Sequence, residues 1–316
     1  MSLKRLVRRS LWLTCLYYVI DDRRAARRLA RGQLETRSGR RHDALALDQS
    51  LGYIDRVYDD YCRYGGVTRF EGGVVEIGPG DNFGVALRLL AGGANDVHAV
   101  DRYVPKRDAA AQRRIYEALA RRPSFAALFD GPPGEQTIRG LRYHPGTPAE
   151  TFFRETPNKY DAIVSRAVLE HLYDPLAALD DMVRALKPGG LMIHRIDLRD
   201  HGMFAGRHKL TFLTIPSWLY RMMTRASGRP NRVLMPAYRD WLKRSGLDGN
   251  LRISRLVGLA DEIEPVSLDA LDPMLKTRAH EVVRAIRPML AAPFRALDDD
   301  SLAASGIVLV ARKPSH

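Results

Sequence analysis

The sequence predicts an α/β protein with a mostly parallel, seven-stranded sheet and helices on both faces. Short buried strand patterns alternate with helical patterns, a glycine-rich turn joins a strand to a helix, and acidic residues end the first two strands. A length of 316 residues, with 45% hydrophobic and 28% charged residues, suits a folded globular chain. This composition excludes disordered and collagen-like proteins.

Each strand is expected where a short apolar run lies between turn signals. The seven runs cover residues 73–77, 96–100, 138–144, 161–165, 191–196, 251–257 and 306–310. Helices are expected over residues 45–64, 85–90 and 109–121 and within 265–294. Another helix is expected after the fourth strand, running through LKPGG and ending at Gly189-Gly190. Residues 200–248 have a looser pattern rich in Trp, Tyr, Met and Arg, which predicts a cap inserted after the fifth strand.

Positive charge is concentrated at the N-terminus. Residues 1–41 contain twelve Lys or Arg and three acids, so they hold +9 of the chain's net charge of +13. We therefore expect a basic helical extension over residues 1–68 and a catalytic domain over 69–316 with its cap at about 200–248. The mildly basic remainder gives no reason to expect a nucleic-acid partner.

The extension contains an apolar run at residues 11–20, flanked by arginines. A membrane-spanning helix needs ~20 apolar residues, and Asp21-Asp22-Arg23-Arg24 follows where a cleavable signal would have small residues. The run predicts an amphipathic helix that packs on the protein body or contacts a membrane surface. With only Cys15 and Cys62 present, no disulfide framework is expected. We expect a cytoplasmic protein, with peripheral contact at the inner face of the membrane as the alternative.

A glycine turn after the first strand predicts a nucleotide-like ligand. Gly78, Gly80 and Gly84 lie in EIGPGDNFG, and Asp101 ends the second strand about 20 residues later. Such a turn lets the backbone approach a ligand at a helix N-terminus, and the carboxylate can accept both ribose hydroxyls. The third glycine is displaced from the dinucleotide pattern G-x-G-x-x-G, which counts against a dinucleotide ligand.

Three motifs resemble those of the class I S-adenosylmethionine-dependent methyltransferases, which have a Rossmann-like fold. They are EIGPG at 76–80, KYDAIVSRAVLEHL at 159–172 and RALKPGGLMIH at 184–194. The resemblance implies S-adenosyl-L-methionine as cofactor, with residues 147–150 beside its adenine. The implied cofactor-binding residues are Glu76, Gly78, Pro79, Gly80, Asn82, Asp101, Arg102, Ser165, Arg166 and Ala167. Asn82 departs from the pattern, because many relatives have a glycine there.

Histidines and acids near the fourth and fifth strands are the candidate catalytic groups. His201 is the preferred general base, with Asp197 as its orienting partner and His171 as an alternative base. Histidine, with an ordinary pKa of about 6.5, suits proton removal near neutrality. No metal is expected, because the fourth strand ends at Ser165, where catechol-type O-methyltransferases have an acid.

The acceptor is expected to be a saccharide, a glycan or a related small polar molecule. The chain has SRAV where amino-methylating nucleic-acid enzymes have an N/D-P-P-Y motif, and neither cysteine lies near the strand ends. Aromatic and hydrogen-bonding residues of the cap region suit a sugar. The substrate-binding candidates are His194, Arg199, Asn231, Arg232 and Tyr238. The layout resembles bacterial methyltransferases of glycan or natural-product assembly. The alternatives are a membrane-associated methyltransferase acting on a lipid or quinone-like acceptor, and a catalytically silent protein that binds an adenosyl ligand or a partner. The sequence predicts no oligomeric state.

Overall fold

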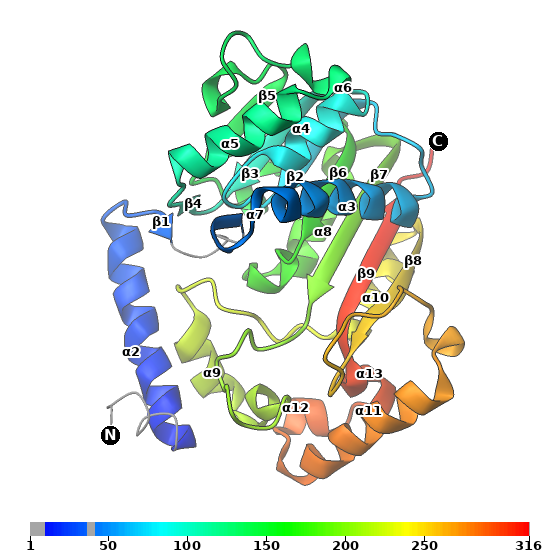
Figure 1. The fold of residues 1–316 in the computed structure, drawn as a ribbon. Coiled ribbons are helices and arrows are strands. Elements are labelled where there is room, and N and C mark those ends of the chain that lie inside the picture. Colours follow the sequence, from blue (N-terminus) through cyan, green and yellow to red (C-terminus); the bar gives the residue numbers. More distant parts are fainter. Residues whose placement is uncertain (1–9, 37–41, 316) are drawn as a thin grey trace.

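A computed structural model describes residues 10–36 and 42–315, and it places a seven-stranded sheet at the centre of the molecule (Figure 1). The strand order is β5-β3-β2-β6-β7-β9-β8. The strands are β2 (Gly72–Ile77), β3 (Ala94–Asp101), β5 (Leu141–Pro145), β6 (Tyr160–Arg166), β7 (Leu186–Asp197), β8 (Asp248–Leu256) and β9 (Ala304–Arg312). From β5 to β7 neighbouring strands are parallel, while β9 is antiparallel to both β7 and β8. The predicted fold class is confirmed.

Helices cover both faces of the sheet, as the strand patterns predict. They include α3 (Leu47–Gly65), α4 (Gly84–Ala91), α5 (Ala109–Ala120), α6 (Pro123–Ala126), α7 (Ala149–Phe152), α8 (Pro175–Ala185) and α10 (Met235–Ser245). Successive strand residues face opposite sides, so Val74 and Val164 join the core beneath α3, α4 and α5, whereas Val75 and Ile163 join the core beside α8 and α10. Two cores therefore hold the sheet between two helical layers.

Three expected elements differ from those observed. The helix expected through LKPGG ends at Ala185, and Leu186 already belongs to β7, where it pairs with Tyr160 of β6. β5 begins at Leu141, because Ile138 instead forms an isolated antiparallel bridge with Phe129. The stretch 265–294 is helical only in the short η5 (Leu268–Ala270), in α11 (Pro273–Ile286), in the short η6 (Arg287–Met289) and in α12 (Ala292–Arg295). Prolines in the first turn explain the starts of α11, η6 and α12, since proline suits the first turn of a helix but not its interior. A last short helix, α13 (Asp299–Ala303), precedes β9.

The predicted N-terminal helix is present as α2 (Leu11–Ala30), which begins where Ser10 Oγ accepts a hydrogen bond from the Leu13 N–H. It lies beside α9 (Ser217–Thr224) of the cap, as Figure 1 shows. After α2 the chain forms β1 (Glu35–Thr36), which pairs in parallel with β4 (Val104–Pro105). The parts of the basic extension at 1–9 and 37–41 lie outside the described residues.

Candidate active site

The glycine turn between β2 and α4 forms the floor of a cavity of about 270 Å³. Gly78 and Gly80 have φ angles of +74° and +77°, which are favourable only for glycine. A Cβ on Gly78 would also lie 2.5 Å from Val168 Cγ2. The turn is tied to the neighbouring strand by a 2.8 Å hydrogen bond from the Gly78 N–H to the Val100 carbonyl. Position 78 therefore requires glycine, because its φ is positive and because there is no room for a Cβ.

Asp101 lines the same cavity from the end of β3. Its Oδ1 accepts a 3.1 Å hydrogen bond from the Tyr103 N–H, which leaves the other oxygen for a ligand. Burial raises the pKa of Asp101 to about 6, against weaker opposing effects of that hydrogen bond and of Arg107. Arg102 and Ala149 also line the cavity, so the stretch 147–150 borders it as expected.

These features fit an adenosyl cofactor. The glycine turn lets a ligand approach the backbone closely, and an ionised Asp101 can accept hydrogen bonds from a ribose. Ala167, directly after β6, also lines the cavity. Of the predicted cofactor-binding residues, Gly78, Gly80, Asp101, Arg102 and Ala167 line the cavity.

The remaining predicted cofactor residues lie away from the cavity lining. Asn82 holds the turn itself, because its Oδ1 accepts a 2.8 Å hydrogen bond from the Gly84 N–H. Ser165 is fully buried against His194, and Arg166 pairs with Asp60 at 2.8 Å in a different cavity. Glu76 is buried with Oε2 unpartnered among the described residues, and burial raises its pKa to about 8. Pro79 is in the turn but does not line the cavity.

The N-terminal helix contributes a wall of the cofactor cavity that the sequence did not predict. Ala25, Arg28 and Leu29 of α2 line it, and Ala226 to Gly228 of the cap meet them there. Buried Asp22 joins these two segments, since its Oδ1 accepts 2.8 Å hydrogen bonds from the N–H groups of Ala226 and Ser227. No local motif marks either segment, because the contact joins residues more than 200 positions apart.

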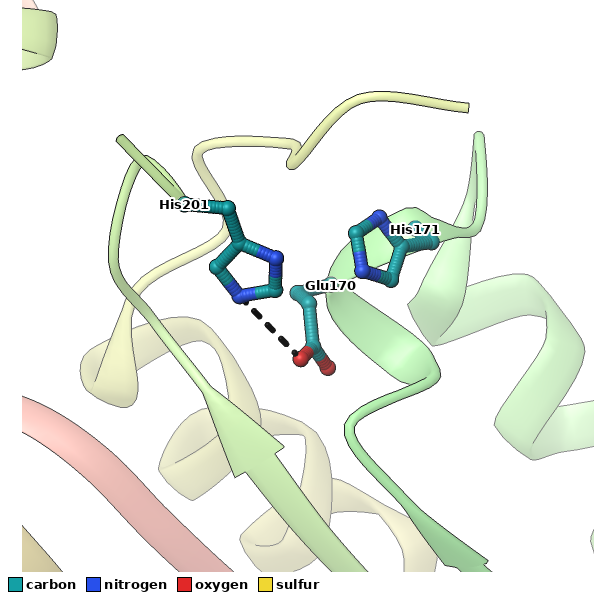
Figure 2. A group of neighbouring side chains, drawn as sticks. All are labelled: Glu170, His171 and His201. Atoms are coloured by element: carbon teal, nitrogen blue, oxygen red, sulfur yellow. Dashed lines mark ion pairs between the residues drawn. The ribbon is translucent and has the colours of Figure 1, made fainter. Parts of the chain in front are cut away.

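His171, Glu170 and His201 form a cluster beside this cavity (Figure 2). The imidazole rings of His171 and His201 lie 4.8 Å apart in an edge-to-face arrangement. His171 lines the cofactor cavity, whereas His201 lines a second cavity of about 600 Å³. The two histidines therefore mark the place where the cavities approach each other.

His201 and Asp197 are brought together, as their spacing of four residues suggests. His201 Nε2 lies 3.4 Å from Asp197 Oδ2 and 3.6 Å from Glu170 Oε1. With Nε2 facing two carboxyl groups, Nδ1 is the nitrogen left to accept a proton. Although burial raises the pKa of Asp197, hydrogen bonds from Arg199 and His201 outweigh it and hold that pKa well below the usual range. Asp197 is therefore an anion that can stabilise a protonated His201.

Burial disfavours the charged form of the other two members of the cluster. Burial lowers the pKa of His171 to about 4, and His171 Nδ1 donates a 2.7 Å hydrogen bond to the Gly228 carbonyl. Burial also raises the pKa of Glu170 well above its usual range, and neither of its carboxyl oxygens has a hydrogen-bond partner among the described residues. His171 is thus placed to hold the cap loop over the cofactor cavity.

A metal ion could use the same cluster. One ligand atom each from Glu170, His171 and His201 lies within 4.8 Å of the others, and two imidazoles with a carboxylate form a donor set that several divalent metals accept. The expectation of a metal-free enzyme, made from the sequence, stays a prediction.

Two residues of the site have backbone conformations that are rare for residues with a side chain. Ala167 has a φ of +56° and His201 a φ of +48°. Each such conformation costs about 1–3 kcal/mol and persists where the surroundings enforce it. Both lie at the cavity walls, so local backbone strain coincides with the candidate site.

The five substrate-binding candidates fall into two groups. Arg199 lines the second cavity and pairs with Asp197 at 2.5 Å. The other four do not line it, and of these only His194 and Tyr238 are fully buried. The Nδ1 atom of His194 lies 2.8 Å from Ser165 Oγ, and Tyr238 is enclosed within α10 and its neighbours. Asn231 donates hydrogen bonds to the carbonyls of Leu169 and Leu172. Arg232 donates hydrogen bonds to the carbonyls of Phe212 and Ile215. Their positions brace the cap and the sheet instead of lining this cavity.

Comparison with known proteins defines the class of this chain. A family model described as a methyltransferase domain matches residues 52–249. No curated protein sequence matches the chain. Solved structures with a similar fold include the [4+2]-cyclase SpnF, at 17% identity over 83% of this chain and 81% of that chain, with a TM-score of 0.42. Phosphoethanolamine N-methyltransferase 2 of Haemonchus contortus, solved with S-adenosyl-L-methionine, is 15% identical over 82% of this chain and 52% of its own, with a TM-score of 0.43.

The fold and the family model together define a class I S-adenosylmethionine-dependent methyltransferase. The chain belongs to the methyltransferase-domain family. The glycine turn and Asp101 fit the S-adenosyl-L-methionine that the three sequence motifs imply as cofactor. The resemblance seen in the three sequence motifs is confirmed.

Proposed function

We propose that this enzyme methylates an oxygen of a saccharide or a related small polar acceptor, with His201 as the general base. One observation supports this most directly. His201 lines the second cavity, its ring 4.8 Å from that of His171 in the wall of the cofactor cavity, and its Nε2 lies 3.4 Å from the Asp197 carboxylate. A hydroxyl acceptor needs a proton acceptor at such a junction, whereas the methyl group needs only close approach and alignment.

The bound cofactor supplies a methyl group on a positively charged sulfur. His201 Nδ1 takes the proton of the acceptor hydroxyl, while its Nε2–H stays directed at Asp197. The Asp197 anion stabilises the imidazolium that results, and Arg199 holds Asp197 in place through hydrogen bonds of 2.8 and 2.5 Å. The acceptor oxygen would gain the methyl group as the sulfur–methyl bond breaks, its electron pair staying on the sulfur of the departing adenosylhomocysteine, and the proton would remain on His201 until water removes it.

The lining of the second cavity supports a polar acceptor. It combines the charged groups Asp200, Arg207 and Lys209 with the apolar side chains of Phe204 and Leu210. Hydrogen-bonding groups beside flat apolar surfaces are the usual partners of a sugar ring, which has hydroxyl edges and an apolar face. A volume of about 600 Å³ leaves room for more than one sugar unit.

The test is methyl incorporation from labelled S-adenosylmethionine into matched panels of free sugars, sugar nucleotides, oligosaccharides, small amines and quinols. We expect incorporation into saccharide hydroxyls and a loss of about 100-fold to 10,000-fold in kcat for His201→Ala. Adenosylhomocysteine binding by that variant should be unchanged. His208→Ala is the matched control, since His208 lines the same cavity but contacts neither Asp197 nor Glu170 in the described ion pairs. Incorporation into amines alone, or full turnover by His201→Ala, would contradict the proposal.

A further inference from the structure

The outer face of α2 has a composition unlike that of an ordinary surface helix. We define this face by its exposed residues Trp12, Leu13, Leu16, Tyr17, Ile20, Arg23, Arg24 and Arg27. Their spacing of three and four residues puts them on one side of the helix. The opposite side, which includes Cys15, Val19 and Ala25, is buried.

The first half of the outer face is apolar and open to solvent. Trp12 is 65% exposed, Leu16 53% and Tyr17 49%. A helix that packs on a protein by one face normally has polar residues on the other. A contiguous exposed apolar surface of this kind marks a place where another surface is bound.

The second half of the outer face is purely cationic. Arg23, Arg24 and Arg27 are exposed and form no ion pair with the described residues. The two acids of α2 are both used on the inner side, because Asp21 pairs with Arg229 at 2.5 Å and Asp22 accepts hydrogen bonds from the cap loop. The outer face therefore presents apolar groups and unneutralised arginines together.

We propose that the outer face of α2 docks the enzyme on an anionic phospholipid surface. Trp, Tyr, Leu and Ile side chains partition into the boundary between headgroups and acyl chains, while neighbouring arginines meet lipid phosphates. A nucleic acid would match the arginines but leave Leu13, Leu16 and Ile20 in water. None of the described helices is long and apolar enough to cross a membrane.

Docking by this face leaves the cofactor cavity intact. The cavity is lined by Ala25, Arg28 and Leu29, whereas Arg23, Arg24, Arg27 and the exposed apolar residues do not line it. The helix can therefore contact lipid with one side while its other side completes the cofactor site. This inference does not depend on which acceptor is methylated.

The experiment is co-sedimentation of the full chain with vesicles of phosphatidylcholine alone or with added phosphatidylglycerol. We expect binding to the anionic vesicles and much weaker binding to the neutral ones. Replacing Arg23, Arg24 and Arg27 together by Glu should weaken binding on the order of a hundredfold, because each arginine near an anionic surface contributes about 1 kcal/mol. Replacing Trp12, Leu16 and Tyr17 together by Ser should also abolish sedimentation with vesicles.

Met274→Ser is the matched control, because Met274 on α11 is 75% exposed yet lies outside α2. Calorimetry with adenosylhomocysteine checks that every variant is folded, and failure of the methylation proposal would leave this vesicle assay unaffected. Equal sedimentation of the wild type and both α2 variants would overturn the inference, as would equal binding to neutral vesicles. A dimer in analytical ultracentrifugation that the Ser variant dissociates, without vesicle binding by the wild type, would assign the face to a second copy instead.

Discussion

Asp22 Oδ1 accepts a 2.8 Å hydrogen bond from the backbone N–H of Ser227, 205 residues later in the chain. The same oxygen accepts from Ala226 at the same distance. This link closes the cofactor cavity between the N-terminal helix and the cap, since residues of both segments line it.

Asp22→Ala should weaken cofactor binding. The substitution leaves the N–H groups of Ala226 and Ser227 without their partner, at a cost of about 1–3 kcal/mol. We expect a loss of tenfold or more in adenosylhomocysteine affinity by calorimetry. Asp22→Asn keeps an oxygen acceptor and should recover part of the affinity. An unchanged Kd for Asp22→Ala would show that the link does not shape the cavity.

Cofactor affinity should depend on pH through Asp101. Burial raises the pKa of this carboxyl to about 6, so it is protonated below that pH and loses capacity to accept hydrogen bonds from a ribose. Adenosylhomocysteine affinity should fall by up to about tenfold per pH unit as the pH drops below about 6. Asp101→Asn should bind weakly with no such slope, and a wild-type slope in that variant would assign the titration elsewhere.

The raised pKa of Asp101 has the opposite effect on the cofactor-free protein. Because the pKa is higher in the folded than in the unfolded chain, this group stabilises the fold fully below about pH 4 and loses that contribution as the pH rises through about 6. Thermal melts of Asp101→Asn should lose this component of the pH dependence.

His171 should act through its hydrogen bond to Gly228 and not through proton transfer. With a pKa of about 4 it stays neutral over the working range, and its Nδ1–H holds the cap loop at 2.7 Å. His171→Ala should therefore weaken adenosylhomocysteine binding, while His171→Asn, whose amide can donate from a similar position, should restore it. If Asn fails to rescue while the pH profile of kcat shifts, the proton-transfer alternative would be favoured.

Gly78→Ala should destabilise the protein and disrupt the cofactor site. An alanine there combines a positive φ with a Cβ 2.5 Å from Val168 Cγ2. Gly246→Ala is the control, because Gly246 has a φ of +67° but no atom within 4 Å of its Cβ position. We expect Gly246→Ala to cost about 1 kcal/mol and Gly78→Ala about 1–3 kcal/mol more in denaturant unfolding. Equal losses would mean that Val168 moves aside without cost.

Chelation should not abolish methyl transfer. In the proposed reaction His201 receives the proton, and a metal on the Glu170, His171 and His201 cluster would occupy that histidine. Dialysis against EDTA should leave kcat within a factor of about two, and added Zn²⁺ or Mn²⁺ should not raise it. If EDTA abolished activity and one divalent metal restored it, the reaction would depend on a metal centre and not on His201 as general base.

Local patterns account for the parts of the molecule that were predicted well. The buried runs at β2, β3, β6 and β7 and the turn at Gly78 and Gly80 are recognisable within a few residues, since strand, turn and helix signals are short in range. The proximity of Asp197 and His201 is also local, being a separation of four positions. The antiparallel insertion of β9 between β7 and β8 was not predicted, because strand order depends on pairing between strands that are far apart in the sequence.

The sequence by itself determined the fold class and the residues of the glycine turn, because these depend on short-range periodicity and backbone conformation. The cofactor was implied by the resemblance of three motifs to a known family. Only the tertiary structure decided that α2 is a wall of the cofactor cavity. It likewise decided that His194 and Tyr238 are buried braces, and that His171 supports the cap loop. Burial, orientation and hydrogen bonds between distant segments such as Asp22 and Ser227 set these roles. Residue identity alone does not specify which neighbours a side chain meets after folding.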